Sequence, residues 1–214
     1  MLIAISHRYR FIFVHVPKTG GSSIKDAICR AHGIDEPVSR PPDHELLPSF
    51  LRFEGSLRDQ RYADYLKFGF VRNPWDRVVS SFTELLHNET KVPAREAIQR
   101  RLRVASLTFD AFVRRCVAPT ARGTRFPGYH HWAPQSDLLA DQQGITVDVV
   151  GRFESLAEDF TKIAQRLQIP SDVPHRNSWP HPHYSTFYTS ETRLLVAEAY
   201  QRDLELWPYS FASK

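Results

Sequence analysis

The chain has 214 residues, of which 42% are hydrophobic and 24% are charged, and its formal net charge is +4. This composition suits one folded α/β domain with a sizeable core; it argues against disorder and does not by itself indicate a nucleic-acid binder. Because no apolar run reaches the length of a membrane span and two lone cysteines form no disulfide framework, we expect a cytoplasmic protein without an integral membrane segment.

The first predicted strand covers residues 11–16 and leads into a loop rich in glycine and hydroxyl side chains. Apolar residues at helical spacing follow from Ile24 and end near Gly33, a suitable C-terminal cap. A helix that opens after Gly20-Gly21 presents unpaired N–H groups and a partial positive charge, which attract a phosphate or sulfate. The glycines allow close approach of the backbone, and the side chains add donors and one full charge. The loop begins at Pro17, and the residues that it offers to an anion are Lys18, Thr19, Gly20, Gly21, Ser22 and Ser23.

The order of residues in this loop separates it from the common triphosphate-binding loop. In G-x-x-x-x-G-K-[ST] the lysine follows the last glycine, and the next hydroxyl holds magnesium. Here Lys18 precedes the glycine pair. The pattern therefore predicts an anion loop of another kind, and a tight turn that happens to contain a lysine is the alternative.

A second strand, residues 66–71, ends in Arg72 and leads into another helix. Before it, residues 34–56 are predicted to be loop with a short helical turn, and residues 57–65 a helix. Asn73 is a favourable N-cap and Pro74 suits the first helical position, so Ser80 falls two turns into the helix. Because ligands of parallel sheets bind at the carboxyl ends of strands, the loops at Lys18 and Arg72 are expected along one edge.

The middle of the chain carries most of its positive charge. Between Lys91 and Arg125 there are nine basic residues and two acidic ones, a local net charge of +7. Residues 108–118 are predicted to be helical and residues 119–137 loop-like. The charge indicates either steering of an anionic ligand or a solvated arginine-rich helix face.

The last third returns to the strand and helix pattern. Residues 146–153 predict a buried strand, and Ser155 with Glu158 has the spacing of a capping box before an amphipathic helix. A proline-rich loop then leads to a final helix near residues 190–206. Strands that alternate with helices predict a central parallel, right-handed α/β sheet flanked by helices.

The two anion motifs together resemble the carbohydrate sulfotransferase family, in particular its soluble bacterial members. The resemblance rests on residues 16–23 (VPKTGGSS) and 70–80 (FVRNPWDRVVS), and it continues through residues 131–135 (HWAPQ), 148–154 (DVVGRFE) and 200–209. It implies a fold similar to that of P-loop kinases, as a single sulfotransferase domain over residues 1–214 with a basic helical excursion at about 88–137.

The resemblance also implies a donor and a set of binding residues. The donor is 3′-phosphoadenosine 5′-phosphosulfate, which leaves adenosine 3′,5′-bisphosphate, and no metal is required. Residues 17–23 correspond to the loop that holds the 5′-phosphosulfate, with Lys18 as a catalytic residue that stabilises charge on the leaving phosphate. Arg72 and Ser80 correspond to the clamp on the 3′-phosphate.

The acceptor hydroxyl needs a general base, which in such enzymes is usually a histidine or glutamate. His44 lies in the corresponding interval and is the favoured candidate, with Glu84 and His131 as alternatives and an exposed loop histidine as the competing interpretation. His15 is expected to be a packed core residue, and His130 and His131 to contact acceptor. The interrupted spacing of His175, His181 and His183 does not favour a metal site.

The sequence as a whole predicts transfer of a sulfuryl group to a hydroxyl of a saccharide or glycolipid, which could be anionic. Two other functions stay open: a metal-dependent nucleotide kinase and a non-catalytic binder of anionic polymers through residues 91–125. Nucleic acid is not expected as a partner.

Overall fold

The computed structural model of the chain describes residues 2–33, 51–52, 56–88, 91–126, 128–174 and 181–212. The chain divides into two compact units, each built from two segments. One unit consists of Met1–Arg72 and Gln135–Ser178, and the other of Asn73–Pro134 and Trp179–Lys214. The expectation of one domain over residues 1–214 stays a prediction.

The first unit is built on a five-stranded sheet with the order β3-β1-β2-β4-β7. Its strands are β1 (Leu2–Ser6), β2 (Phe11–His15), β3 (Leu51–Arg52), β4 (Leu66–Val71) and β7 (Val149–Arg152). The pairings of β2 with β4 and of β4 with β7 are parallel, as predicted. The strand expected over 146–153 is shorter, and the predicted α/β class with helices flanking the sheet is confirmed.

The strands on one side of this sheet, β1 and β3, pair antiparallel, which the sequence pattern did not indicate. β1 and β2 form a hairpin in which Leu2 pairs with His15 and Ser6 with Phe11, and β3 adds to the outer side of β1. Only four residues join β1 to β2, too few for the crossover that parallel strands need. The parallel part is therefore confined to β2, β4 and β7.

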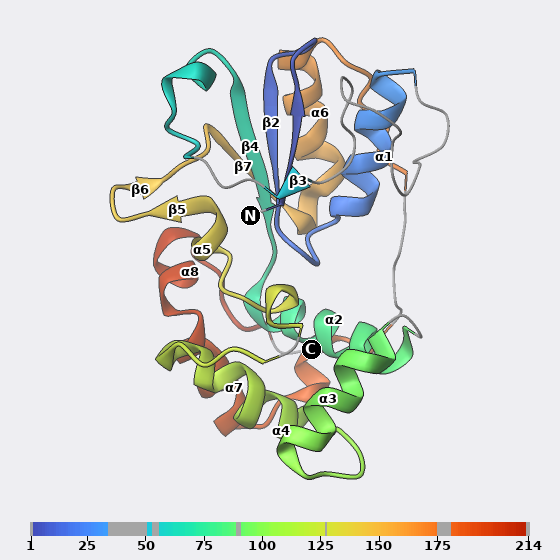
Figure 1. Cartoon of the computed structure of the whole chain (residues 1–214), viewed down its shortest axis with the longest axis vertical. Coiled ribbons are helices and arrows are strands. Elements are labelled where there is room, and N and C mark those ends of the chain that lie inside the picture. Colours follow the sequence, from blue (N-terminus) through green and yellow to red (C-terminus); the bar gives the residue numbers. More distant parts are fainter. Residues whose placement is uncertain are drawn as a thin grey trace. The chain divides into compact units, whose positions relative to one another are not determined.

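Two helices cover one face of the sheet, α1 (Gly21–Ala31) and α6 (Leu156–Leu167) (Figure 1). Successive side chains of a strand point to opposite faces, so Phe11, Phe13, Phe68 and Phe70 all face these helices. They meet apolar side chains of both helices, among them Ile24 and Phe160, in one buried cluster. This packing holds the end of β2 against the first turn of α1.

Two local predictions in the first unit are wrong. Residues 57–65 contain only a single 3₁₀ turn, Gln60–Tyr62, whose start is capped by the Asp59 side chain. The capping box expected from Ser155 and Glu158 is not formed, because Ser155 Oγ donates to Asp159 instead, at 2.8 Å. The helix that it was meant to start, α6, is present.

The first unit also contains a short helix and a separate two-stranded sheet. These are α5 (Ser136–Leu139) and the short antiparallel pair β5 (Ala140–Asp141) and β6 (Gly144–Ile145). The fully buried Leu139 approaches β4 at Gly69, where a side chain would bring a Cβ within 2.6 Å of it. Gly69 therefore permits this close contact.

The second unit is helical around its own core. It contains α2 (Pro74–His87), α3 (Val92–Leu102), α4 (Phe109–Phe112), α7 (Ser190–Ala199) and α8 (Gln201–Leu206). α2 starts as predicted, with the Asn73 side chain accepting from the Trp75 amide. The predicted helix 108–118 exists but passes through a π-helical turn, Val113–Val117, into a 3₁₀ turn that ends at Arg122.

The predicted final helix is two helices, separated at Tyr200. The Tyr200 hydroxyl donates to the Trp132 carbonyl inside the core of this unit. Trp132 is itself 1% exposed. Among the described residues no helix is long and apolar enough to cross a membrane.

Candidate functional site

The predicted anion loop turns from the end of β2 into the first turn of α1. Lys18 has a φ of 71° and Gly20 a φ of 81°, both in the left-handed region. Thr19 is fully buried, and its Oγ1 donates to the Val16 carbonyl at 2.8 Å. A left-handed conformation strains a residue that has a side chain, by about 1–3 kcal/mol, and such strain gathers at functional sites. The strained residue here is the lysine that the sequence singled out.

The N-terminus of α1 is not capped by a side chain. Gly20 is its N-cap residue, no side-chain cap hydrogen bond is made, and no acidic residue stands in the first turn. Ser22 is half-buried and Ser23 is buried. No carboxylate in this first turn therefore offsets its partial positive charge, which suits an anion site.

Arg72 follows β4 and reaches the same loop. Its Nη1 donates to the Lys18 carbonyl at 3.2 Å, and its guanidinium carbon lies 4.1 Å from the ring centroid of Phe153. The residue is 7% exposed. The predicted placement of the Lys18 and Arg72 motifs at the ends of adjacent parallel strands is confirmed, while their binding roles stay predictions.

Gln135 fixes the backbone of Arg72 from the other side. Its Oε1 accepts from the Arg72 amide at 2.8 Å, and its Nε2 donates to the Arg72 carbonyl at 3.0 Å. The Gln135 side chain is fully buried. Sequence reasoning assigned no role to Gln135 or Phe153, although both lie in the stretches that carried the resemblance. Only their contacts with Arg72 identify them as its supports.

His15 also belongs to this site. Its ring lies against the backbone of Gly21, where an added Cβ would come within 2.1 Å of His15 Nδ1. The residue is half-buried and contacts Phe13 edge-on, at 6.3 Å between ring centroids. The prediction of a packed histidine is therefore right in part, and the ring also determines which residue can start α1.

The other predicted site residues fall elsewhere. His44 and His175 lie outside the described residues. Ser80 lies on α2 in the second unit and is 8% exposed. Asp76 lies in the first turn of the same helix, and its Oδ1 is 3.8 Å from His181 Nε2. The two form an ion pair when the histidine is protonated. No group of three or more metal-ligating side chains occurs in the described part of the chain.

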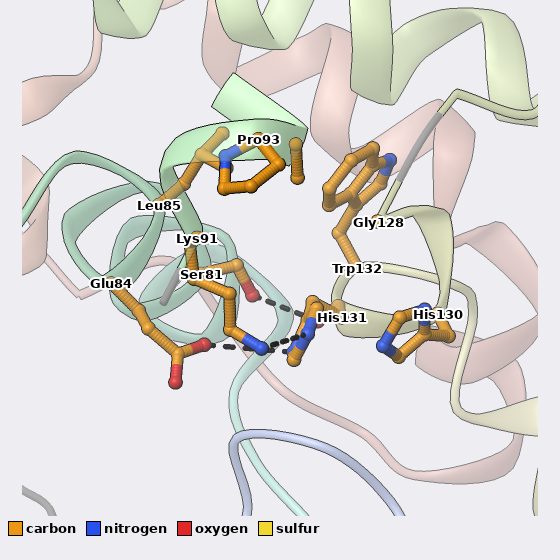
Figure 2. A pocket seen from close by; sticks show the side chains of 10 residues that line it. Ser81, Glu84, Leu85, Lys91, Pro93, Gly128, His130, His131 and Trp132 are labelled. Atoms are coloured by element: carbon orange, nitrogen blue, oxygen red, sulfur yellow. Dashed lines mark hydrogen bonds and ion pairs between the residues drawn. The ribbon is translucent and has the colours of Figure 1, made fainter. Parts of the chain in front are cut away.

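The two alternative base candidates, Glu84 and His131, meet in a pocket of the second unit (Figure 2). Glu84 Oε2 lies 3.5 Å from His131 Nδ1, and Lys91 Nζ lies 3.0 Å from His131 Nε2. Ser81 Oγ donates to the His131 carbonyl at 2.8 Å. Because an ammonium group only donates, Nε2 accepts from Lys91 and the ring proton sits on Nδ1, facing Glu84.

The His130 ring lies against the His131 ring, with 4.1 Å between the ring centroids and 41° between the ring planes. His130 is exposed, but partial burial of its ring lowers its pKa below the ordinary value. The Lys91 charge lowers this pKa further, and Glu84 raises it. His130 is therefore neutral at pH 7 and able both to donate and to accept.

The sheet with its strained loop defines an α/β protein with a candidate anion site at the ends of parallel strands. The sequence matches the Sulfotransferase family over residues 2–210, and the chain belongs to that family. No solved structure matches it.

Carbohydrate sulfotransferases are among its relatives. Carbohydrate sulfotransferase 10 of Gallus gallus is 31% identical over 189 residues, which cover 78% of this chain and 52% of that protein. Carbohydrate sulfotransferase 14 of Mus musculus is 30% identical over 200 residues, covering 84% and 50%. Carbohydrate sulfotransferase 10 of Xenopus laevis is 26% identical, covering 97% and 67%. The chain spans about half to two thirds of the length of these curated relatives.

Proposed function

We propose that this chain transfers a sulfuryl group from 3′-phosphoadenosine 5′-phosphosulfate to a hydroxyl of a saccharide or glycolipid acceptor. Membership of the sulfotransferase family and the names of the relatives support the reaction class. The observation that carries the proposal is the loop itself. A strained lysine lies in the loop just before a helix start that no side chain caps, and a buried arginine donates a hydrogen bond to the carbonyl of that lysine.

These residues fit a donor that carries phosphate groups. Lys18 supplies a full positive charge at the loop, and the N–H groups of the α1 first turn supply oriented donors. Arg72 carries a second charge, held in place by Phe153 and Gln135. The donor supplies the activated sulfuryl group, and the chain contributes positioning and charge stabilisation around the leaving phosphate. Ser80 stays a predicted donor-binding residue.

The general base is to be chosen among His44, Glu84 and His131. In the pocket His131 Nε2 is engaged by Lys91, so His131 accepts a proton there only when Lys91 moves aside. Substitution of each candidate by the residue closest in shape, with rates measured at saturating donor, separates them. Substitution of the residue that acts as the base is expected to lower turnover by about 10²–10⁴-fold.

Titration calorimetry with adenosine 3′,5′-bisphosphate, in EDTA, tests the donor site. The intact chain is expected to bind this nucleotide without metal. Lys18→Ala weakens binding about tenfold or more, because it removes a hydrogen bond to a charged group. Lys162→Ala is the matched control, since this exposed lysine of the same unit pairs with Glu158 and Asp159, away from the loop residues.

The rival functions predict different results. Binding of ATP that requires magnesium, with no affinity for the bisphosphate, indicates a nucleotide kinase. Salt-sensitive binding of heparin, without turnover of labelled donor against a broad panel of hydroxyl acceptors, indicates a non-catalytic binder of polyanions. Either result refutes the proposed function.

A further inference from the structure

The second unit contains a pocket of about 250 Å³ between α2, α3 and the turn at Gly128–Trp132 (Figure 2). All of its lining residues belong to this unit. Its volume lies below the roughly 300–1,000 Å³ typical of sites for drug-sized ligands. A ligand that fits it has the size of a single small ring.

The two sides of the pocket differ in chemistry. Leu85, Pro93, Ala94 and Trp132 supply apolar surface, and the polar side consists of Ser81, Glu84, Lys91, His130 and His131. Figure 2 shows Glu84, Lys91 and Ser81 gathered around His131 on the side opposite Pro93. Such a division suits a ligand with one C–H face and a rim of groups that form hydrogen bonds.

The polar side is pre-organised by its own hydrogen bonds. Lys91 donates to His131 Nε2, which leaves two further N–H donors on the ammonium group. Glu84 faces the Nδ1 proton at 3.5 Å and presents acceptor oxygens beside it. The neutral His130 ring adds a group that donates and accepts. Donors and acceptors thus alternate within a small area, which matches the two-way hydrogen bonding of hydroxyl groups.

The charge of this pocket differs from that of the anion loop in the first unit. The Lys91 ammonium and the Glu84 carboxylate offset each other around His131, and His130 is neutral at pH 7. The pocket therefore offers an anion no excess of positive charge. A neutral polyhydroxyl ring meets a partner for each kind of group, and its C–H face meets Leu85, Pro93 and Trp132.

We propose that this pocket binds one pyranose ring of the acceptor, with Glu84 and Lys91 holding ring hydroxyls and Leu85, Pro93 and Trp132 packing against the C–H face. The identification of that ring as part of the acceptor rests on the proposed function. Binding of the sugar itself depends on neither donor nor turnover. The two proposals can therefore fail separately.

Saturation-transfer NMR with the intact chain and no donor tests the pocket. The probes are methyl β-D-galactopyranoside, methyl β-D-glucopyranoside and the methyl β-glycoside of N-acetylglucosamine, titrated at millimolar concentration. At least one is expected to bind. Glu84→Gln keeps the shape of the side chain and is expected to weaken binding about tenfold, through loss of a charged acceptor.

Two further variants keep the result interpretable. Ala94→Leu adds bulk inside the pocket without removing a polar group and abolishes binding, whereas Glu96→Leu places the same side chain on the exposed side of the same helix and leaves binding unchanged. Circular dichroism confirms that each variant is folded.

Three results overturn the proposal. The first is that none of the three glycosides binds the wild-type chain. The second is that Ala94→Leu binds them as the wild-type chain does. The third is that inorganic sulfate displaces them from the pocket, which makes it an anion site. If the glycosides bind as expected but adenosine 3′,5′-bisphosphate does not, the pocket stands and the proposed function fails.

Discussion

The contact between Gly21 and His15 gives the sharpest test of how the anion loop is built. In Gly21→Ala the new methyl carbon would lie 2.1 Å from His15 Nδ1 and 2.2 Å from Cε1. Non-bonded carbon atoms in contact normally lie about 3.5–4.0 Å apart. The rigid ring or the helix start must therefore move by more than an ångström. Such overpacking typically costs about 1–3 kcal/mol.

The higher helix propensity of alanine partly offsets the cost of this overpacking. Alanine is the better helix former by up to about 1 kcal/mol, so the expected net loss of unfolding free energy is about 1–2 kcal/mol. For a chain of this size that corresponds to a drop in Tm of about 2–8 °C. Urea denaturation and calorimetry measure the loss, and the displaced loop is also expected to bind adenosine 3′,5′-bisphosphate more weakly.

A double-mutant cycle isolates the clash. His15→Ala removes the ring, so Gly21→Ala in that background is expected to be neutral or stabilising. The reasoning is refuted if Gly21→Ala alone is as stable as the wild-type chain. It is equally refuted if Gly21→Ala destabilises the His15→Ala protein as much as it destabilises the wild-type chain.

Three further perturbations test other parts of the structure. Gln135→Leu strips the buried Arg72 amide and carbonyl of their partners and should lower the unfolding free energy by about 2 kcal/mol or more in urea titrations; no change would contradict those bonds. Burial, and then the Arg8 charge, lower the pKa of His32 below its ordinary value of 6.5. The unfolded chain therefore binds more protons below that pH, and stability is lost as pH falls toward the lowered pKa; His32→Gln should flatten this dependence between pH 7.5 and 5.5. Burial raises the pKa of Cys116 to about 12, so this thiol should resist Ellman's reagent at pH 8 until urea is added, and rapid labelling of the native chain would disprove its burial.

The parts of the fold that could be predicted from the sequence are those set by interactions between residues close together in the chain. Strand β4 and the start of α2 follow from an apolar run, the Asn73 cap and Pro74, and these signals act within a few residues. The anion loop was recognisable for the same reason, because Lys18 and the glycine pair adjoin the helix that they precede. Parallel strands bring their carboxyl ends to one edge, and this general rule was enough to place Arg72 near the loop.

Other features depended on contacts between distant segments. The pairing of β1 with β3, for example, brings Leu2 opposite Arg52. The supports of Arg72 come from Gln135 and Phe153, which lie 63 and 81 residues further along the chain. No periodicity in the sequence connects such positions.

The amino-acid sequence was enough to identify the family, the candidate anion loop and the helices whose caps are local. The folded structure was needed to show that Lys18 is backbone-strained, that His15 excludes a side chain at Gly21, and that Glu84, Lys91 and His131 share one pocket. The physical reason is that caps, turns and amphipathic periods are short-range, whereas steric exclusion and hydrogen-bond networks arise only when segments far apart in the chain pack together.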